Sequence, residues 1–323
     1  MTKEPKIPAA LQPDPADYAF DLETVLSSVV GLRAIIPQDA FTAPALGTER
    51  EGSGIVIGDD GLLLTMSYLI VEAETVWITA ADGRTMPGHA LAYDNATGFG
   101  LVQPLGKLTL PKLELGNSDA AATGQDALFA SAGGRPAAIE TKIASRQEFA
   151  GYWEYLLDDA IFTAPAHPFW GGGALIGKDG TLLGVGSLAL QQSDAEGRRH
   201  DMNMIVPINL LHPILDALRQ HGRANRTPRP YIGIYAAEDE ETVVIGGVAT
   251  GGPAEHAGLR KGDHVMAVEG EAITTLAELW RALWACGSPG GRITLAVQRD
   301  DQMRQVPIVT AEWHSMFKTP RMH

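Results

Sequence analysis

The chain has 323 residues, of which 45% are hydrophobic, and this is enough for two or three domains with cores of their own. Its 25 Lys and Arg face 39 Asp and Glu, and the net charge of −14 disfavours nucleic acid and anionic lipid surfaces as partners. No apolar run approaches the roughly 20 residues of a membrane span, so no membrane insertion is expected. The single cysteine, Cys286, excludes an internal disulfide.

The N-terminal part predicts an arm followed by a β-rich domain. Residues 1–19 are rich in proline and charge, and they show no basic region followed by an apolar stretch of signal-peptide length. A cytoplasmic location is therefore predicted, with a periplasmic location as the open alternative. From Gly52 onward, short apolar runs alternate with turn sequences, and this rhythm continues to about Ile208. We therefore predict a domain over residues 20–221 with two β-barrels and a closing helix over Asn209–Arg219.

The C-terminal part predicts a second, smaller domain. Residues 222–230 have the composition of a linker, residues 231–313 form the small domain, and residues 314–323 are a tail. A helix is expected over Thr275–Ala285, between β-rich runs.

Three segments of the larger domain carry a specific resemblance. The sequence GSGIVIGDDGLLLTMSYLIVEA begins at Gly52, ADGRTMPGHALAYDNATGFGLVQ at Ala81, and HPFWGGGALIGKDGTLLGVGS at His167. They resemble the three catalytic segments of HtrA/DegP-type serine proteases. The resemblance implies a mainly β chain: a trypsin-like double β-barrel followed by a small α+β PDZ domain.

In this resemblance the catalytic His, Asp and Ser positions fall on Tyr68, Gly98 and Gly171. Acyl transfer needs a nucleophile, a base of near-neutral pKa and an orienting carboxylate, and none of these three residues supplies one. Phe169 stands where the family has a glycine that shapes the oxyanion hole, and bulky Trp170 follows it. We therefore expect a pseudoprotease that is not an enzyme.

Two alternatives stay open at this point. A rewired protease could pair His89 or His167 with Ser53, Ser67 or Ser187, and Cys286 is a weaker nucleophile candidate. His200, Met202 and Met204, with the tail pair Met322-His323, could bind a soft metal, although methionines in such a strand pack as ordinary hydrophobic residues. No metal or other cofactor is expected.

The small domain is similar to a bacterial PDZ domain, on the run from Gly252-Pro253-Ala254 through Gly262-Asp263 to Gly270. The resemblance implies that a loop presents backbone N–H groups to the carboxylate at the end of a bound peptide. The apolar stripe of the following helix would contact the side chains of that peptide. The predicted peptide-binding residues are Tyr231, Ile232, Gly233, Ile234, Leu276, Leu279, Trp280 and Leu283.

These expectations combine into a bacterial peptide-binding adaptor, scaffold or chaperone-like subunit that binds protein or peptide C-termini. The alternatives are a residual or rewired serine protease and a metal-handling or purely structural subunit. The resemblance also implies a homotrimer assembled through N-terminal aromatic residues, here Tyr18, Phe20 and Phe41.

Overall fold

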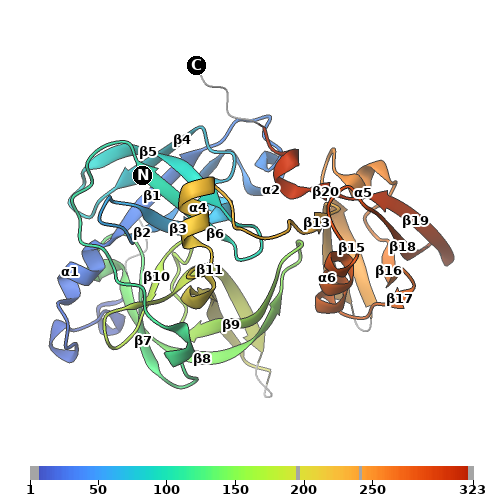
Figure 1. Cartoon of the computed structure of the whole chain (residues 1–323). Coiled ribbons are helices and arrows are strands. Elements are labelled where there is room, and N and C mark those ends of the chain that lie inside the picture. Colours follow the sequence, from blue (N-terminus) through green and yellow to red (C-terminus); the bar gives the residue numbers. More distant parts are fainter. Residues whose placement is uncertain (1–6, 194–196, 240–241, 319–323) are drawn as a thin grey trace. The chain divides into compact units, whose positions relative to one another are not determined.

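The computed structural model describes residues 7–193, 197–239 and 242–318, and the chain forms two compact units (Figure 1). One unit contains the residues up to Gln147 together with Asp159–Asn225, and the other contains Glu148–Asp158 together with the residues from Arg226 onward. Strands dominate both units, which confirms the predicted fold class.

The first unit begins with a closed barrel in the order β1-β2-β3-β6-β5-β4. Turn glycines with positive φ, Gly61 at 80° and Gly83 at 83°, connect its hairpins, because only glycine adopts this conformation without strain. The strands are β1 (Val29–Ile35), β2 (Glu49–Val56), β3 (Leu63–Met66), β4 (Thr75–Thr79), β5 (Thr85–Tyr93) and β6 (Phe99–Pro104). The helices around them are η1 (Ala9–Leu11), η2 (Pro15–Asp17), α1 (Leu22–Ser27), α2 (Ala43–Leu46) and α3 (Ser67–Ile70).

A second closed barrel follows in the order β10-β11-β12-β9-β8-β7. Its buried residues, among them Phe129, Ile161 and Leu175, form one hydrophobic cluster. The strands are β7 (Asp126–Ala130), β8 (Ala138–Ala150), β9 (Leu156–Ala164), β10 (Ala174–Ile176), β11 (Leu182–Ser193) and β12 (Arg199–Pro207), with the short helices η3 (Ser118–Ala120) and η4 (Arg135–Ala137).

The helix predicted over Asn209–Arg219 is wrong in its extent. The chain forms η5 (Ile208–Leu210) and then α4 (Leu215–His221). Pro213 accounts for the interruption, because proline lacks an N–H and keeps the preceding residue away from helical angles.

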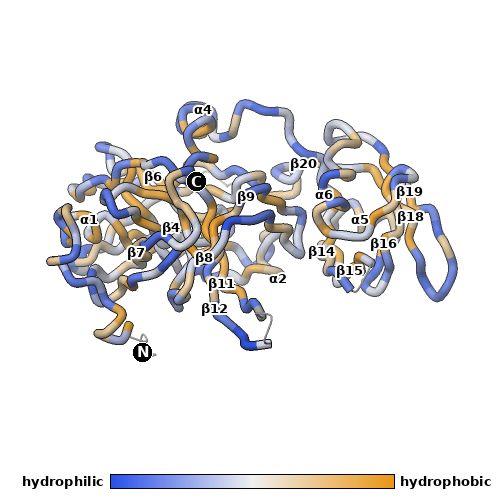
Figure 2. The backbone as a smooth tube through the Cα atoms, turned by 90° about the horizontal axis from the view of Figure 1, so that it is seen from below, coloured by the Kyte–Doolittle hydropathy of each residue, from blue (hydrophilic) through white to orange (hydrophobic). Residues whose placement is uncertain are grey.

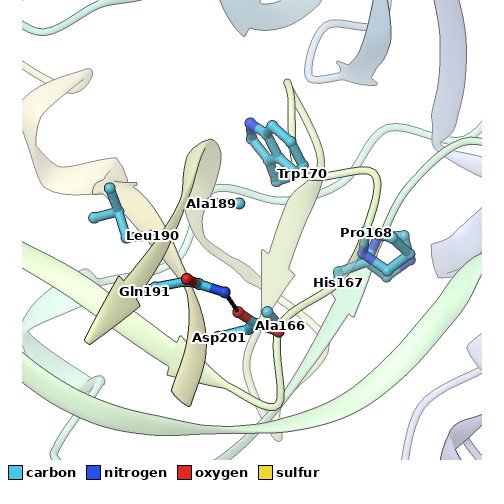
Figure 3. A pocket seen from close by; sticks show the side chains of 8 residues that line it. All are labelled: Ala166, His167, Pro168, Trp170, Ala189, Leu190, Gln191 and Asp201. Carbon is cyan, nitrogen blue, oxygen red and sulfur yellow. Dashed lines mark hydrogen bonds between the residues drawn. The ribbon is translucent and has the colours of Figure 1, made fainter. Parts of the chain in front are cut away.

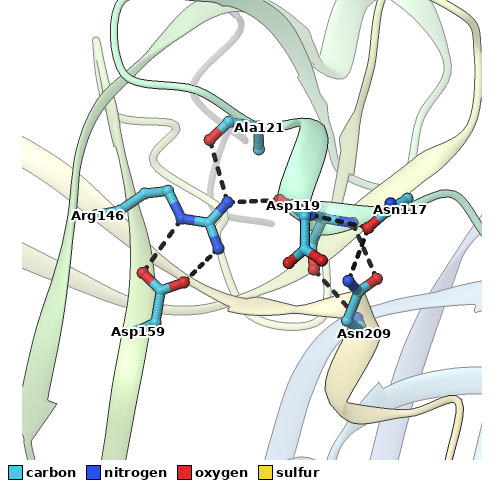
Figure 4. Close-up of polar contacts among 7 residues, drawn as sticks. Asn117, Asp119, Ala121, Arg146, Asp159 and Asn209 are labelled. Atoms are coloured by element: carbon cyan, nitrogen blue, oxygen red, sulfur yellow. Dashed lines mark hydrogen bonds and ion pairs between the residues drawn. The ribbon is translucent and has the colours of Figure 1, made fainter.

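A polar network anchors η3 and η5 (Figure 4). The Arg146 guanidinium on β8 forms an ion pair with Asp159 and also donates to the carbonyls of Ser118 and Ala121. Asn209 accepts from the Ser118 N–H at 3.0 Å and donates to Asn117 at 2.7 Å. These contacts link the segment before the second barrel to the segment that follows it.

The second unit contains a sheet in the order β14-β15-β16-β18-β19, with β17 paired to β16. Helix α6 (Leu276–Ala285) begins after Thr275, whose hydroxyl accepts from Glu278 in a capping box. The strands are β14 (Ile234–Asp239), β15 (Thr242–Val248), β16 (His264–Val268), β17 (Glu271–Ala272), β18 (Arg292–Arg299) and β19 (Gln302–Val309). Outside this sheet lie the pair β13 (Pro230–Tyr231) and β20 (Ala311–Glu312), and the helices α5 (Pro253–His256) and η6 (Trp313–Met316).

Hydropathy follows burial in this unit. The hairpin between β18 and β19 is hydrophilic (blue in Figure 2), and the first four residues of β19 are exposed. Trp280, Leu279 and Leu283 of α6 are completely buried in the core of the unit. Within the described ranges, the helices are all too short or too polar to span a bilayer.

Asp263 connects the loop before β16 to β18. Its side chain is 1% exposed and accepts from Arg299 Nε at 2.5 Å, from Arg299 Nη2 at 2.7 Å and from the Arg260 N–H at 2.9 Å. Burial acts to raise the pKa of this carboxyl, but the hydrogen bonds from Arg299 and Arg260 outweigh burial and hold the pKa below its usual value.

We predict that Asp263→Asn destabilises this unit by about 1 to 3 kcal/mol, because the buried amide of Asn cannot accept from both Arg299 nitrogens and the Arg260 N–H as the carboxylate does. Urea titration of the full chain, followed by amide exchange in β18, measures the change. Asp300→Asn, an exposed acid next to Arg299 in the same hairpin, is the control. Equal stability of the two variants would contradict the prediction.

Candidate functional site

Tyr68 is held by the short helix α3, directly after β3. The N–H of Ser67 donates to the carbonyl of Gly98 at 2.7 Å, which ties this turn to the start of β6. Arg50, only 5% exposed, donates to the carbonyls of Tyr68 at 2.8 Å and Val71 at 3.1 Å. The backbone around Tyr68 is therefore fixed from both sides.

Gly171 lies in the loop between β9 and β10, where the second barrel meets the first. Its carbonyl accepts from the Ser53 N–H at 2.8 Å. A Cβ added at Gly171 would lie 2.8 Å from the Tyr68 hydroxyl oxygen. The structure thus brings Tyr68 and Gly171 together. Gly98 is joined to this site by its hydrogen bond with Ser67, the residue before Tyr68. That these three are the triad positions of the family stays a prediction.

The chemistry of these residues follows from their surroundings. The Tyr68 hydroxyl donates to the carbonyl of Ser187 at 3.1 Å, and burial raises the pKa of Tyr68 well above its ordinary value. Such a phenol stays protonated at neutral pH and does not act as a base. Gly98 has a φ of 81°, so an aspartate at this position would be strained.

A pocket of about 350 Å³ is lined by residues of the second barrel and of the loop that precedes Gly171 (Figure 3). Trp170, directly before Gly171, and Leu190 of β11 contribute apolar side chains to it. Gln191 donates to Asp201 at 2.8 Å across the neighbouring strands β11 and β12. The lining residues are Ala166, His167, Pro168, Trp170, Ala189, Leu190, Gln191 and Asp201. Of these, Leu190, Gln191 and Asp201 had no motif in the sequence that marked them.

His167 has both ring nitrogens engaged with backbone groups. Nδ1 accepts from the N–H of Phe169 at 3.0 Å, and Nε2 lies 3.0 Å from the carbonyl of Ala137. The ring is therefore neutral with its proton on Nε2, and burial lowers its pKa. The Phe169 N–H is directed to His167, so it is not available to an oxyanion.

The other candidate residues for a rewired protease lie within strands and helices or hydrogen-bond to the backbone. Ser53 Oγ accepts from the Ala132 N–H at 3.1 Å, and Ser187 is 2% exposed. His89 lies on β5 opposite Gln103, and Ser67 lies at the start of α3. The Cys286 thiol lies 3.1 Å from the Ala282 carbonyl, and burial raises the pKa of this thiol, away from that of a reactive thiolate.

The residues considered as an alternative soft-metal site are His200, Met202 and Met204 of β12 and the tail pair Met322-His323. Met202 and Met204 are buried, with 6% and 0% exposure, as hydrophobic residues of the strand, while His200 is exposed. Met322 and His323 lie outside the described residues. Across residues 7–193, 197–239 and 242–318, no three His, Cys, Asp or Glu side chains gather in a way that could hold a metal.

The predicted carboxylate-binding loop of the small domain holds a side chain of this chain itself. Gly233, with a φ of 81°, donates its N–H to Glu154 Oε1 at 2.6 Å, and Ile232 and Ile234 donate at 3.2 and 3.4 Å. Glu154 belongs to the same compact unit and is 5% exposed. No sequence motif marks Glu154, and the aromatic residues Tyr152, Trp153 and Tyr155 around it are the available signal.

The predicted apolar stripe of α6 faces the core. Leu276 is 7% exposed, and Leu279, Trp280 and Leu283 are completely buried. Trp280 Nε1 donates to the carbonyl of Gly151 at 3.0 Å. The helix thus contacts the segment that carries Glu154, and its role toward a free peptide stays a prediction.

The comparisons with known proteins agree with these two units. Residues 52–185 match a trypsin-like peptidase domain, and residues 230–310 match a PDZ domain. Two solved structures, an HtrA-type protease AlgW with tripeptide and the same protease with decapeptide, share the fold. They have TM-scores of 0.53 and 0.52 at 20% and 19% identity, and cover 96% and 93% of this chain and 99% and 98% of theirs.

Curated relatives extend this likeness. A probable periplasmic serine endoprotease DegP-like from Halomonas elongata is 24% identical over 81% of this chain and 56% of its own length. The putative serine protease HhoA from Synechocystis is 26% identical over 97% of this chain and 86% of its own length. The chain spans little more than half the length of the DegP-like relatives. Together the matches show a chain with a trypsin-like peptidase domain and one PDZ domain that is similar to HtrA- and DegP-type proteases.

These comparisons correct two expectations. The prediction that the chain is not an enzyme is wrong by this measure, because the relatives are named serine proteases and endoproteases. The cytoplasmic location is not supported, because the DegP-like relatives are described as periplasmic.

The homotrimer stays a prediction. The Tyr18 and Phe20 rings pack on each other within one chain, with 5.2 Å between their centroids.

A double-mutant cycle tests the contact between Tyr68 and Gly171. Gly171→Ala places a Cβ against the Tyr68 hydroxyl and is expected to cost about 1 to 3 kcal/mol in stability. In a Tyr68→Phe background that oxygen is gone, so the cost is expected to fall by at least about 0.5 kcal/mol. Additive effects in urea denaturation would contradict the contact.

A second test uses the titration of Glu154. Burial raises the pKa of Glu154 to about 8, against the effect of the N–H donors of Gly233, Ile232 and Ile234, while Tyr231 and Tyr235 also face it. Because the pKa of Glu154 is raised in the folded protein, its contribution to folding stability is fully present below its ordinary pKa of 4.5. That contribution is lost as the pH rises through about 8. We expect the NMR signal of the Gly233 amide to titrate near pH 8; titration near pH 4.5 would contradict this environment.

Proposed function

We propose that this chain acts on polypeptides as an HtrA/DegP-type serine protease whose hydrolysis is residual or rewired. The observation that carries the proposal is the pocket lined by Trp170, the residue directly before Gly171, whose added Cβ would lie against the Tyr68 hydroxyl. A peptide side chain in this pocket would bring the neighbouring peptide bond to the meeting point of the two barrels. The names of the relatives, serine proteases and endoproteases, support the reaction class.

The chemistry of this site differs from acyl transfer at a serine. Without a hydroxyl at residue 171 no acyl-enzyme forms there, so we propose that water adds directly to the peptide carbonyl. The C–N bond then breaks, and the leaving amine takes up a proton from that water. In a related serine protease, loss of the triad costs on the order of 10⁶ in turnover and leaves about 10³ to 10⁴ over the uncatalysed reaction.

The second part of the proposal concerns the PDZ domain, which we propose binds the carboxyl termini of peptides. The loop at Ile232–Ile234 directs its N–H groups at a carboxyl group, and β14 lies at the edge of its sheet, where a peptide adds as a strand. AlgW, of similar fold, has been solved with a tripeptide and with a decapeptide.

Proteolysis of an unfolded substrate tests the first part. We expect slow release of new N-termini, identified by mass spectrometry, and loss of this release in Ala189→Trp, which fills the pocket. Gln192→Trp, on the same strand but outside the pocket lining, is the matched control and should keep the activity. Release that is the same in Ala189→Trp as in the unaltered chain, or no release at all, would rule out hydrolysis at this pocket.

A gain of function checks the position of the site. The triple variant Tyr68→His, Gly98→Asp, Gly171→Ser supplies a nucleophile, a base and a carboxylate at the predicted positions. We expect it to cleave at least about 100-fold faster than the unaltered chain. The strain at residue 98 makes the same variant without Gly98→Asp a useful comparison. Unchanged rates in both folded variants would contradict the assignment of these positions.

A further inference from the structure

The segment Gly151–Tyr155 pairs with the edge strand β14 of the PDZ sheet through a single bridge. The N–H of Ala236 on β14 donates to the carbonyl of Tyr152 at 2.6 Å, and Trp153 pairs antiparallel with Tyr235. Strand β14 is the first strand of its sheet, so this edge is where a bound peptide would add. The segment therefore uses the backbone groups that a peptide ligand requires.

Glu154 places a carboxyl group where the terminal carboxylate of a peptide would lie. Its Oε1 is 2.6 Å from the N–H nitrogen of Gly233, and its Oε2 is 3.3 Å from that of Ile232. Successive N–H groups in such a loop form a concave site for anions. The side chain thus satisfies the same donors that a peptide terminus would satisfy.

Further contacts hold the segment at both ends. The Trp280 indole donates to the Gly151 carbonyl, and the Tyr152 ring lies 6.3 Å from the ring of Tyr235 on β14 between centroids. Leu156, 7% exposed, belongs to the hydrophobic core of the unit. The exposed Arg281 forms ion pairs with Glu148 before the segment and Asp158 after it.

We propose that residues 151–155 are an internal ligand of the PDZ groove, with Glu154 in place of a peptide's terminal carboxylate. This proposal rests on the proposed function that the groove binds peptide carboxyl termini. A tethered ligand acts at an effective concentration of millimolar order, so a free peptide binds only when the segment leaves. The apparent affinity for free peptides is reduced by the fraction of chains in which the groove is open.

Amide hydrogen exchange of the full chain tests the docking without any peptide. Glu154→Ala removes the acceptor, so the amides of Ile232–Ile234 and Ala236 are expected to exchange at least about tenfold faster. Asp158→Ala, which removes an exposed acid that follows the segment, is the matched control and should leave them nearly unchanged. Equal exchange in Glu154→Ala and the unaltered chain would overturn the proposal.

Peptide binding tests the competition. The probe is a fluorescent decapeptide pool with randomised last four residues and a free carboxylate, compared with the same pool amidated. We expect Glu154→Ala to bind the free-carboxylate pool at least about tenfold more tightly than the unaltered chain does. Arg281→Glu, a surface change that repels both Glu148 and Asp158, is expected to tighten binding in the same direction and guards against a misfolded Glu154 variant.

The outcomes separate the two proposals. Equal and carboxylate-dependent binding by all variants would overturn the internal ligand and leave the peptide-binding groove intact. Faster exchange in Glu154→Ala with no binding of either pool by any variant would overturn the groove as a peptide site, although the segment docks. Gly233→Trp, which blocks the loop, should abolish any genuine groove binding.

Discussion

The two barrels of the first unit meet backbone to backbone, and the candidate site depends on this contact. The Ser53 N–H donates to the Gly171 carbonyl at 2.8 Å, and a Cβ at Gly172 would lie 2.0 Å from the Ser53 carbonyl oxygen. Only glycine allows so close an approach, and Gly172 also has a φ of 74°. The run Gly171–Gly173 therefore sets the distance between the barrels, and Tyr68 occupies the space that a side chain at Gly171 would need.

In this arrangement the fold resembles that of the relatives, whereas the side chains at the candidate site have other hydrogen-bond partners than catalysis requires. The fold and the names of the relatives show what the chain is similar to, namely HtrA- and DegP-type proteins. The Tyr68 phenol, hydrogen-bonded to Ser187, and the neutral His167 ring, bonded to Phe169 and Ala137, are both engaged in holding the loops. A fold supports many chemistries, so the rate of hydrolysis has to be measured at this site and not transferred from relatives.

The sequence predicts local features well and distant contacts poorly. Turn sequences, the capping residue Thr275 and the PDZ motif act within a few residues, and the structure has the strands and α6 where they indicate. The helix predicted over Asn209–Arg219 is shorter in the structure, because Pro213 interrupts the helix although the apolar pattern continues through it. Glu154 binds N–H groups 78 to 80 residues away, and no periodicity within either segment encodes that pairing.

The energetics of Glu154 suit a ligand that can be displaced. Burial of a carboxyl group is costly, as its raised pKa of about 8 shows, and the N–H groups of the loop offset part of that cost. The ion pairs of Arg281 are exposed and contribute little. The contact of Tyr152 with Tyr235 and the burial of Leu156 in the core of the unit therefore contribute to the docking, while Glu154 determines where the segment lies. The terminal carboxylate of a peptide accepts from the same N–H groups without the cost of burying the Glu154 side chain. A free peptide therefore competes with the internal ligand for these N–H groups, the contact that costs the internal ligand most.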